Sequence, residues 1–254
     1  MKITSIKTGI IKKGDNLFEI ISKNIKKLPE QSVLAIAAKI VSVCQGRLIE
    51  KKESRKFEKY ELIKEEADYY LDPSESRYGI MCTIKNNILG INAGVNKCNV
   101  DEGYILLPKD IQNTTNKIWK YLKNYYSVKK IGVIVVDSNI LPLRWGAIGI
   151  AVSYCGFEAL YDYQNEKDIF NRKLSLPQIN IADALAASAV LDMGEAGEKR
   201  PFCIIEKVNK VRFQNRVPTQ RELKKFLVDI KNDLFAPILE NTNWKKGKNG
   251  KIKQ

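Results

Sequence analysis

The chain has 254 residues, of which 44% are hydrophobic and 28% are charged, and its formal net charge is +14. A chain of this length can bury a sizeable core as one large domain or as two lobes. It contains no histidine, which excludes imidazole as a metal ligand or catalytic base and therefore excludes Ser-His-Asp chemistry.

The cysteines and the basic residues narrow the class of protein further. Five widely spaced cysteines, none in a Cys-x-x-Cys arrangement, favour neither a disulfide framework nor a zinc site. The charge fits nucleic acid, an anionic membrane or small polyanionic substrates, but the lysine-rich pattern lacks interleaved aromatic residues and does not favour nucleic acid. The N-terminus lacks an apolar segment, and the longest apolar run is broken by Lys39. We therefore expect a soluble cytoplasmic protein with no membrane segment.

The first half of the chain predicts helices separated by extended segments. Asp15 is placed to cap a helix whose apolar residues recur at helical spacing up to Pro29. A second amphipathic segment ends at a turn-rich stretch of aspartate, proline and serine. The predicted elements are a helix over 17–28, a strand over 33–43, a helix over 57–71, a strand pair over 80–84 and 88–92, and a helix over 111–125.

The second half opens with an unbroken apolar run over 131–136, which is typical of a strand buried on both faces. Shorter apolar segments over 147–152 and 160–161 follow, and an alanine-rich helix is predicted over 179–193. A capping box of Thr and Glu opens a predicted helix over 220–234. Helices and strands do not alternate regularly, so we predict an α+β fold with mixed and antiparallel sheets.

Two acidic positions in this half suggest a cation site. Asp137 and Ser138 follow the buried strand, and Glu195 follows Gly194 at a helix end, where the dipole disfavours a carboxylate unless a cation compensates it. Carboxylate and hydroxyl oxygens are ligands for hard divalent cations. Each of the two acidic positions also has an explanation that involves no cation. Residues 137–139 can form a turn whose side chains bond its own amides, and Glu195 can be a loop carboxylate beside basic neighbours.

Further polar residues are open to two interpretations. Residues 92–99 combine a glycine with several asparagines, which can form a tight turn or can contact a purine base or a phosphate-bound metal. Arg144 and Arg172 can recognise carboxylate or phosphate through their planar guanidinium groups, or can be surface arginines.

The order of these motifs resembles the coenzyme F420:L-glutamate ligases, also called F420-0:gamma-glutamyl ligases. The similarity covers Lys2 to about Leu239, so the ligase domain is assigned to 1–240 and the basic remainder, 241–254, is expected to be a disordered tail. Segments over 217–222 and 233–237 are most similar to a bacterial branch associated with folate metabolism. The matching motifs are Gly14-Asp15, Asn92-Ala93-Gly94, Asp137-Ser138, Arg144-x-Gly146, Gly149-Ile150-Ala151, Asp162-Tyr163, Asp168-Ile169-Phe170-x-Arg172, Ala182-Asp183 and Met193-Gly194-Glu195.

The resemblance implies a two-lobed, homodimeric enzyme. It would use GTP and Mg²⁺ or Mn²⁺ to join L-glutamate, through a γ-glutamyl amide bond, to an acidic acceptor. The acceptor would be a folate or the deazaflavin precursor of coenzyme F420, and the reaction would pass through an acyl phosphate. Because charge neutralisation and positioning can supply most of this catalysis, the lack of histidine does not weaken the hypothesis.

The resemblance also implies roles for individual residues. Asp137 and Glu195 would be catalytic and, with Ser138 and Asn96, would be metal ligands, while Arg144 and Arg172 would bind substrate. The implied nucleotide-binding residues are Ile10, Ile11, Ala38, Lys39, Asn99, Met193, Gly194, Ala196 and Gly197. Two positions depart from the family: Asn96 stands where an aspartate ligand is usual, and Val43 stands where the best-known members have a lysine. These departures leave open an alternative, a catalytically silent nucleotide-binding paralogue with a regulatory role.

Overall fold

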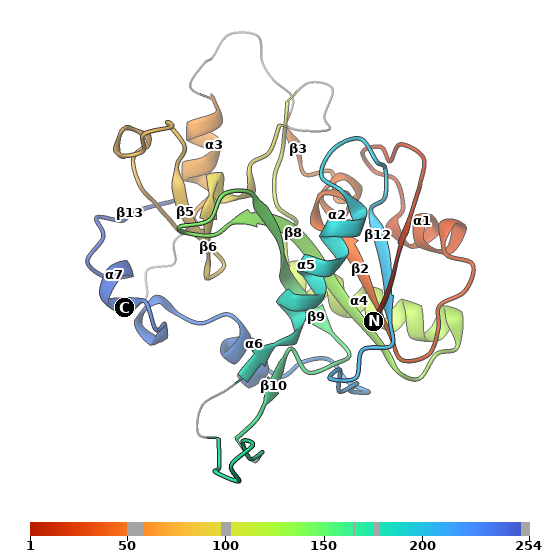
Figure 1. Cartoon of the computed structure of the whole chain (residues 1–254). Helices are drawn as coiled ribbons and strands as arrows, with labels where there is room; N and C mark the ends of the chain where they lie inside the picture. Colours follow the sequence, from red (N-terminus) through yellow and green to blue (C-terminus); the bar gives the residue numbers. More distant parts are fainter. Residues whose placement is uncertain (50–57, 98–102, 165, 175–177, 250–254) are drawn as a thin grey trace.

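The structure, a computed structural model of the chain, describes residues 1–49, 58–97, 103–164, 166–174 and 178–249. It has the α+β fold that the sequence predicts, built on a central five-stranded sheet (Figure 1). Strands β2 and β8 run parallel, and the other neighbouring pairs run antiparallel. In spatial order the strands are β1 (Lys2–Ile6), β12 (Phe202–Glu206), β2 (Ser32–Ala37), β8 (Ile131–Ile140) and β9 (Ala147–Cys155).

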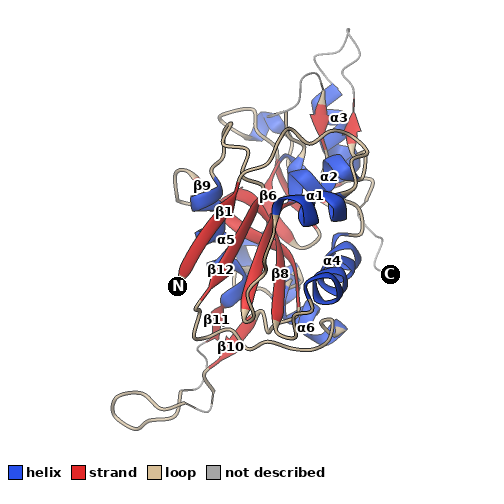
Figure 2. Ribbon diagram, turned by 90° about the vertical axis from the view of Figure 1, so that its right-hand side faces the viewer, coloured by secondary structure: helices blue, strands red, loops and turns tan. Residues whose placement is uncertain are grey.

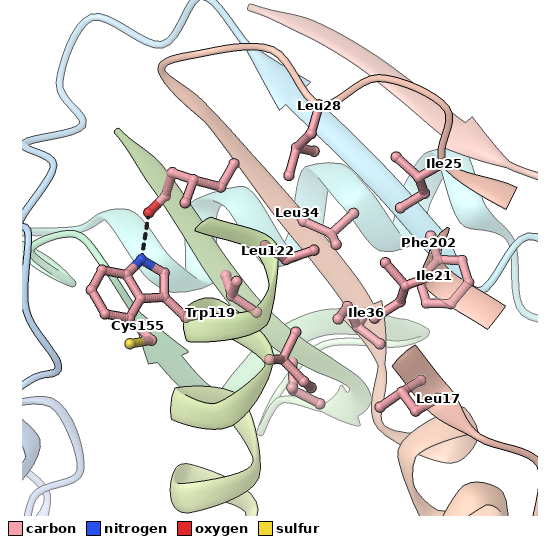
Figure 3. Packing of buried hydrophobic residues seen from close by; sticks show 14 of the residues in the cluster. Leu17, Ile21, Ile25, Leu28, Leu34, Ile36, Trp119, Leu122, Cys155 and Phe202 are labelled. Atoms are coloured by element: carbon pink, nitrogen blue, oxygen red, sulfur yellow. Dashed lines mark hydrogen bonds between the residues drawn. The ribbon is translucent and has the colours of Figure 1, made fainter. Parts of the chain in front are cut away.

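Helices cover both faces of this sheet (Figure 2). One face carries α1 (Leu17–Asn24), α2 (Ala38–Cys44) and α4 (Ile111–Tyr126), and the other carries α5 (Ile181–Met193). The indole Nε1 of Trp119 on α4 donates a hydrogen bond of 2.9 Å to the carbonyl oxygen of Ile131, so the buried indole is satisfied within the core (Figure 3). The layers therefore form two hydrophobic cores, one on each side of the sheet.

Strand β8 contributes to both cores, because alternate side chains of a strand point to opposite faces. Val133 and Val135 belong to the core under α4, whereas Ile134 and Val136 belong to the core under α5. Every residue from Ile131 to Val136 is buried. This double burial explains the continuous apolar run in the sequence.

A second, smaller part of the molecule has its own sheet and core. Helix α3 (Glu58–Glu66) packs in this smaller part. The hydrophobic core of the smaller part is formed by Ile63, Ala67, Met81, Ala93, Val95 and Leu106. The sheet order is β13 (Lys245–Lys246), β4 (Tyr69–Tyr70), β5 (Cys82–Lys85) and β6 (Ile88–Ile91). The end of β8 meets this part of the molecule, because Asn139 Nδ2 donates to the Leu89 carbonyl oxygen at 2.9 Å.

Short elements complete the described part of the chain. No helix in that part is long and apolar enough to cross a membrane. The remaining elements are β3 (Leu48–Ile49) paired with β7 (Tyr104–Ile105), β10 (Leu160–Asp162) paired with β11 (Gln178–Asn180), α6 (Gln220–Phe226), α7 (Ala236–Leu239), and the 3₁₀ turns η1 (Pro73–Glu75), η2 (Asn92–Gly94) and η3 (Ile230–Asn232).

Four predicted elements have different boundaries in the structure. The helix predicted over 17–28 ends at Asn24, where the next residue is extended. The strand predicted over 33–43 ends at Ala37, whose amide donates to the Pro201 carbonyl oxygen at 2.9 Å, and the chain then forms α2. The helix predicted over 57–71 ends at Glu66, because the next residues pair with β5. The helix predicted over 220–234 ends at Phe226. Helix α1 is capped by Asn16 rather than Asp15. For β2 and α3, contacts with a distant segment prevail over local periodicity.

Residues 241–249 of the basic segment that was expected to be a disordered tail contact the smaller sheet, and 250–254 lie outside the described residues. Lys245–Lys246 pairs with β4, and the Gly247 amide donates to the Asp68 carbonyl oxygen at 3.0 Å. Two of its lysines form salt bridges, Lys245 with Asp72 at 2.9 Å and Lys248 with Glu65 at 2.7 Å. Charge complementarity with a distant part of the chain, which composition does not reveal, orders this segment.

The capping box of α6 is expected to make a pH-dependent contribution to the free energy of unfolding. The Glu222 carboxylate accepts from the Thr219 amide at 2.7 Å and forms two bonds with Arg216, which holds the pKa of Glu222 well below its usual range. We expect Glu222→Gln to lower the free energy of unfolding by about 1 kcal/mol at pH 7. Because the native pKa is depressed, this contribution is present above about pH 4.3 and is lost as the pH falls below it.

Urea denaturation at several pH values measures this difference. The matched control is Glu240→Gln, which removes an exposed carboxylate at the end of α7. A difference between wild type and Glu222→Gln that stayed constant down to pH 3 would contradict the assignment.

Candidate functional site

Two adjoining cavities lie where the central sheet meets the smaller part of the molecule. The first has a volume of about 380 Å³ and the second about 320 Å³. Both are lined by Lys39, Ile105, Asp137 and Ser138, which therefore form the wall that the cavities share.

Asp137 and Ser138 reach this wall because β8 continues beyond its buried half. They are strand residues, paired in register with Ile150 and Gly149 of β9, and not the local turn that their sequence also allows. The pairing is irregular between Val135 and Val136, just before Asp137. Such bulges often re-aim side chains near functional sites.

The Asp137 carboxyl group lies in an unusual electrostatic environment. Its pKa is raised to about 6, mainly by burial and to a smaller extent by the negative charge of Glu195, while the Ser138 amide and the Lys39 ammonium group oppose the shift. A carboxylate with this environment is stabilised by any additional cation placed beside it.

Glu195 is delivered to the first cavity by the loop that follows α5. Gly194 has a φ of +82°, and a Cβ at that position would lie 2.4 Å from Glu198 Cδ, so glycine is required there. The loop is tied to the segment after β1 by a hydrogen bond of 2.8 Å from the Thr8 amide to the Lys199 carbonyl oxygen, and the last turn of α5 is tied to β1 by a hydrogen bond of 2.8 Å from the Ser5 amide to the Asp192 carboxylate. Within the described part of the chain, Glu195 forms no salt bridge with the basic residues that follow it.

Helix α5 is itself fixed to the sheet beneath it. The Asp183 carboxylate accepts a hydrogen bond of 2.8 Å from the Ala151 amide of β9 and also bonds Asn180, which caps the helix. Further along, Gly149 allows close approach, because a Cβ there would lie 2.5 Å from the Ala186 carbonyl oxygen. The packing of α5 on β9 thus determines how far Glu195 lies from Asp137.

The structure brings most of the predicted nucleotide-binding residues together around the first cavity. They are Ile10, Ile11, Ala38, Lys39, Met193, Gly194, Ala196 and Gly197. Val43 and Glu198 line the same cavity. Asn99 lies outside the described residues. The roles of these residues remain predictions, but their convergence from three separate segments is a property of the fold.

Asn96 lines the second cavity and not the first. Its backbone exchanges two hydrogen bonds with Ile105, at 2.9 and 2.8 Å. Asn96 and Glu195 therefore approach the shared wall from different cavities. Ser42, Lys59 and Lys97, which were assigned no role from the sequence, also line the second cavity. Lys97 belongs to the polar segment over 92–99, whereas Ser42 and Lys59 come from isolated positions with no local motif, so no sequence signal pointed to those two.

Arg144 and Arg172 do not line either cavity. Arg144 lies in the exposed β8–β9 turn, beside Leu143 and Trp145, which are 96% and 91% exposed. Arg172 lies in the segment between β10 and β11 that projects from the molecule (Figure 1), where it pairs with Asp168 at 2.8 Å and covers the Phe170 ring. Within a single chain these arginines are held away from the cavities, and their assignment to substrate remains a prediction.

The donor set fits a magnesium or manganese ion. Mg²⁺ is typically held by one or two carboxylates, with the remaining positions taken by water and substrate phosphates. Asp137, Ser138 and Glu195 supply two carboxylates and a hydroxyl at one cavity, and the raised pKa of Asp137 marks a carboxylate that lacks charge compensation. No group of three or more His, Cys, Asp or Glu side chains with metal-binding geometry occurs among the described residues, so phosphate and water would have to complete the coordination.

Comparisons with known proteins identify the family of this chain. The family model described as F420-0:Gamma-glutamyl ligase matches residues 5–207. The chain is 30% identical to the coenzyme F420:L-glutamate ligase of Methanocaldococcus jannaschii, over 82% of this chain and 88% of that protein. It is 35% identical to the protein of the same name from Methanococcus maripaludis strain C6, over 74% and 80% of the two chains. The matched span contains Asp137, Ser138 and Glu195.

Proposed function

This chain belongs to the F420-0:gamma-glutamyl ligase family, and we propose that it uses GTP and Mg²⁺ or Mn²⁺ to add L-glutamate to an acidic acceptor through a γ-glutamyl amide bond. The observation that supports this most strongly is the convergence of Asp137, Ser138 and Glu195 on one cavity. The similar proteins are named as ligases of coenzyme F420 and L-glutamate. We propose a homodimer as the functional state.

The proposed reaction has two steps. A carboxylate oxygen of the acceptor attacks the γ-phosphorus of GTP, the bond to the β–γ bridging oxygen breaks, and GDP leaves. The amine nitrogen of glutamate then attacks the acyl carbon, the amide bond forms, and inorganic phosphate leaves with the electron pair of the broken C–O bond. The nitrogen loses its extra proton to solvent or phosphate. No protein nucleophile is needed.

The residues of this chain would bind and orient the reactants. Lys39 on the shared wall would contact the transferred phosphoryl group, and the loop over residues 194–201 would cover the nucleotide. Asp137, Ser138 and Glu195 would hold the divalent cation, which when bound supplies neutralisation of phosphate charge. Holding the reactants together in the two cavities would supply much of the remaining rate enhancement.

Two acceptors have independent support. The names of the similar proteins favour the deazaflavin precursor of coenzyme F420. The segments over 217–222 and 233–237 favour a folate. The second candidate function, a silent nucleotide-binding paralogue, rests on Val43, an apolar residue that lines the first cavity where a lysine is usual in the family.

Incorporation of labelled glutamate tests the proposal. The protein is incubated with GTP, Mg²⁺ or Mn²⁺, labelled L-glutamate and either a folate or the deazaflavin precursor, and product is separated by chromatography. We expect incorporation with one acceptor, with release of one GDP per amide bond. Tight GTP binding in calorimetry, without incorporation into either acceptor, would replace the ligase proposal with the silent paralogue.

Asn96 gives a prediction about the cation. Replacing Asn96 with aspartate adds a carboxylate to the second cavity beside Asp137, and divalent cations bind carboxylates more strongly than amides. We expect the Kd for Mn²⁺ with bound GTP to fall by about tenfold in calorimetry. The control is Asn92→Asp, which adds the same charge to the same cavity. Equal gains in both variants would indicate general attraction and would remove Asn96 from the ligand set.

A further inference from the structure

The second cavity differs from the first in the charge of its lining, although the two share a wall. Its volume is about 320 Å³, and its lining combines Asn92, Asn96 and the end of β8 with apolar residues such as Ile91 and Leu107. The first cavity is also lined by apolar residues, and its basic residues are matched by the carboxylates of Asp137, Glu195 and Glu198. An excess of ammonium groups, by contrast, suits an anionic ligand.

The charge around the second cavity is unbalanced. Its described lining contains three lysines, Lys39, Lys59 and Lys97, and one carboxylate, Asp137. None of the three lysines forms a salt bridge with another residue in the described part of the chain. Three like charges around one cavity repel each other, and an anion bound between them offsets that repulsion.

Two other basic residues of the smaller part, by contrast, are paired with a carboxylate. Arg47 and Lys85 are largely buried, and both pair with the Glu66 carboxylate, with Arg47 Nη2 at 2.8 Å. These two cations are neutralised within the fold and do not line the cavity. Lys59 and Lys97 have no such partner among the described residues, so their charge is available to a ligand.

We propose that the second cavity binds the carboxylates of a substrate, with Lys59 and Lys97 as the contacting groups. The inference rests on the proposed ligase function and extends it to residues outside the nucleotide cavity. A volume of about 320 Å³ is at the small end of ligand sites, and suits a glutamyl-sized dicarboxylate better than a complete folate or deazaflavin. Such a group occurs in free L-glutamate and also at the carboxylate end of an acceptor.

The position of the cavity suits this role. A carboxylate held by Lys59 and Lys97 would lie on one side of the wall formed by Asp137 and Ser138, and the triphosphate would lie on the other. Lys39 lines both cavities and can contact both ligands. The amide-forming step requires this arrangement, since the carboxylate-bearing substrate must meet the phosphoryl group without occupying the nucleotide site.

Steady-state kinetics separate the two sources of the carboxylate. We expect Lys59→Ala and Lys97→Ala to raise the KM for one carboxylate substrate by about tenfold or more, with the KM for GTP changed by less than about twofold. A raised KM for L-glutamate identifies the amino acid as the occupant, and a raised KM for the acceptor identifies the acceptor. Lys59→Arg, which keeps the charge, is expected to recover part of the loss. The control, Lys26→Ala, removes an exposed lysine that lines neither cavity.

Equilibrium binding tests the inference without turnover. Glutarate has two carboxylates and no amine, so it can occupy the cavity but cannot react. In ligand-observed NMR we expect saturable glutarate binding to wild type and to Lys26→Ala, weakened by about tenfold in Lys59→Ala and in Lys97→Ala. A protein that binds glutarate in this way but does not incorporate glutamate would refute the ligase function and retain the cavity assignment.

Two results would overturn the inference. One is glutarate binding that is absent in wild type or equal in all variants. The other is a raised KM for GTP with unchanged KM values for both carboxylate substrates, which would make the second cavity part of the nucleotide site. Circular dichroism of each variant checks that the fold is retained, and the two lysines provide independent tests because they lie on different elements.

Discussion

Replacing Asp137 with asparagine is expected to abolish most glutamate incorporation and, at the same time, to stabilise the protein in the absence of metal. The loss of a charged cation ligand is expected to lower kcat by about a thousandfold, since charge neutralisation at a phosphoryl group is worth several kcal/mol. The gain in stability has a separate cause. Burial and the charge of Glu195 raise the pKa of Asp137 to about 6, so the ionised carboxylate destabilises the metal-free fold at neutral pH.

The pH dependence of this gain follows from the direction of the shift. Below about pH 4 the carboxyl group is neutral in both folded and unfolded chains, and the variant has no advantage. As the pH rises from about 4 to 6 the unfolded chain ionises first, and the advantage of asparagine grows to about 3 kcal/mol at pH 7. Urea denaturation of wild type, Asp137→Asn and the surface control Glu240→Gln at pH 4, 5.5 and 7 measures it.

Ligand binding is expected to make the wild type more stable than Asp137→Asn. With GTP and Mg²⁺ present the wild type is expected to gain stability from binding, while Asp137→Asn gains little. A variant that was less stable than wild type at pH 7 without metal, or that kept normal turnover, would show that Asp137 is not the uncompensated carboxylate described above.

Replacing Gly149 with alanine is expected to damage the site from a distance. The added Cβ would lie 2.5 Å from the Ala186 carbonyl oxygen and 2.6 Å from Val190 Cγ2, so α5 must move away from β9. The helix backbone cannot yield as a flexible side chain can. We expect the free energy of unfolding to fall by about 1–3 kcal/mol, the range for an overpacked interior.

The displacement of α5 should also weaken metal binding and lower turnover. Glu195 follows the C-terminus of α5, so moving the helix changes its separation from Asp137. A shift of about 1 Å in a positioned group can lower turnover by about a hundredfold. We therefore expect weaker Mn²⁺ binding in calorimetry and a lower kcat at temperatures where the variant is fully folded.

The control for Gly149→Ala is Ala184→Ser, which adds one atom to the exposed face of the same helix. It should leave stability and turnover unchanged. If Gly149→Ala lost stability but kept its metal affinity and kcat, the packing of α5 would not determine the geometry of the site.

The long and strongly patterned elements could be predicted from the sequence. The buried strand, the helix over 111–126, the strand pair around residue 86 and the capping box of α6 all occur as predicted. Each is specified by a local pattern: an apolar run, a 3.6-residue period, or a cap. The α+β class follows from their order.

Local patterns fail where another segment competes for the same residues. The apolar run over 33–43 is compatible with a strand, but the parallel partner β8 pairs with it only as far as Ala37, after which the chain forms α2 and places Lys39 at the wall of both cavities. The composition of the basic end of the chain predicts a solvated tail. In the structure, Lys245 and Lys248 pair with acidic residues that are far away in the sequence.

The sequence by itself determined the chemistry available to this protein: oxygen ligands without imidazole, a buried strand that carries Asp137, and a helix end that carries Glu195. Composition and short-range pattern suffice for this, because they depend on which residues are present and on their immediate neighbours. Only the tertiary structure decided that these carboxylates share a cavity, that Asn96 approaches from a second one, and that Lys59 and Lys97 leave that second cavity with unbalanced positive charge. Distances between segments far apart in the chain arise from packing of the whole fold, and no local signal encodes them.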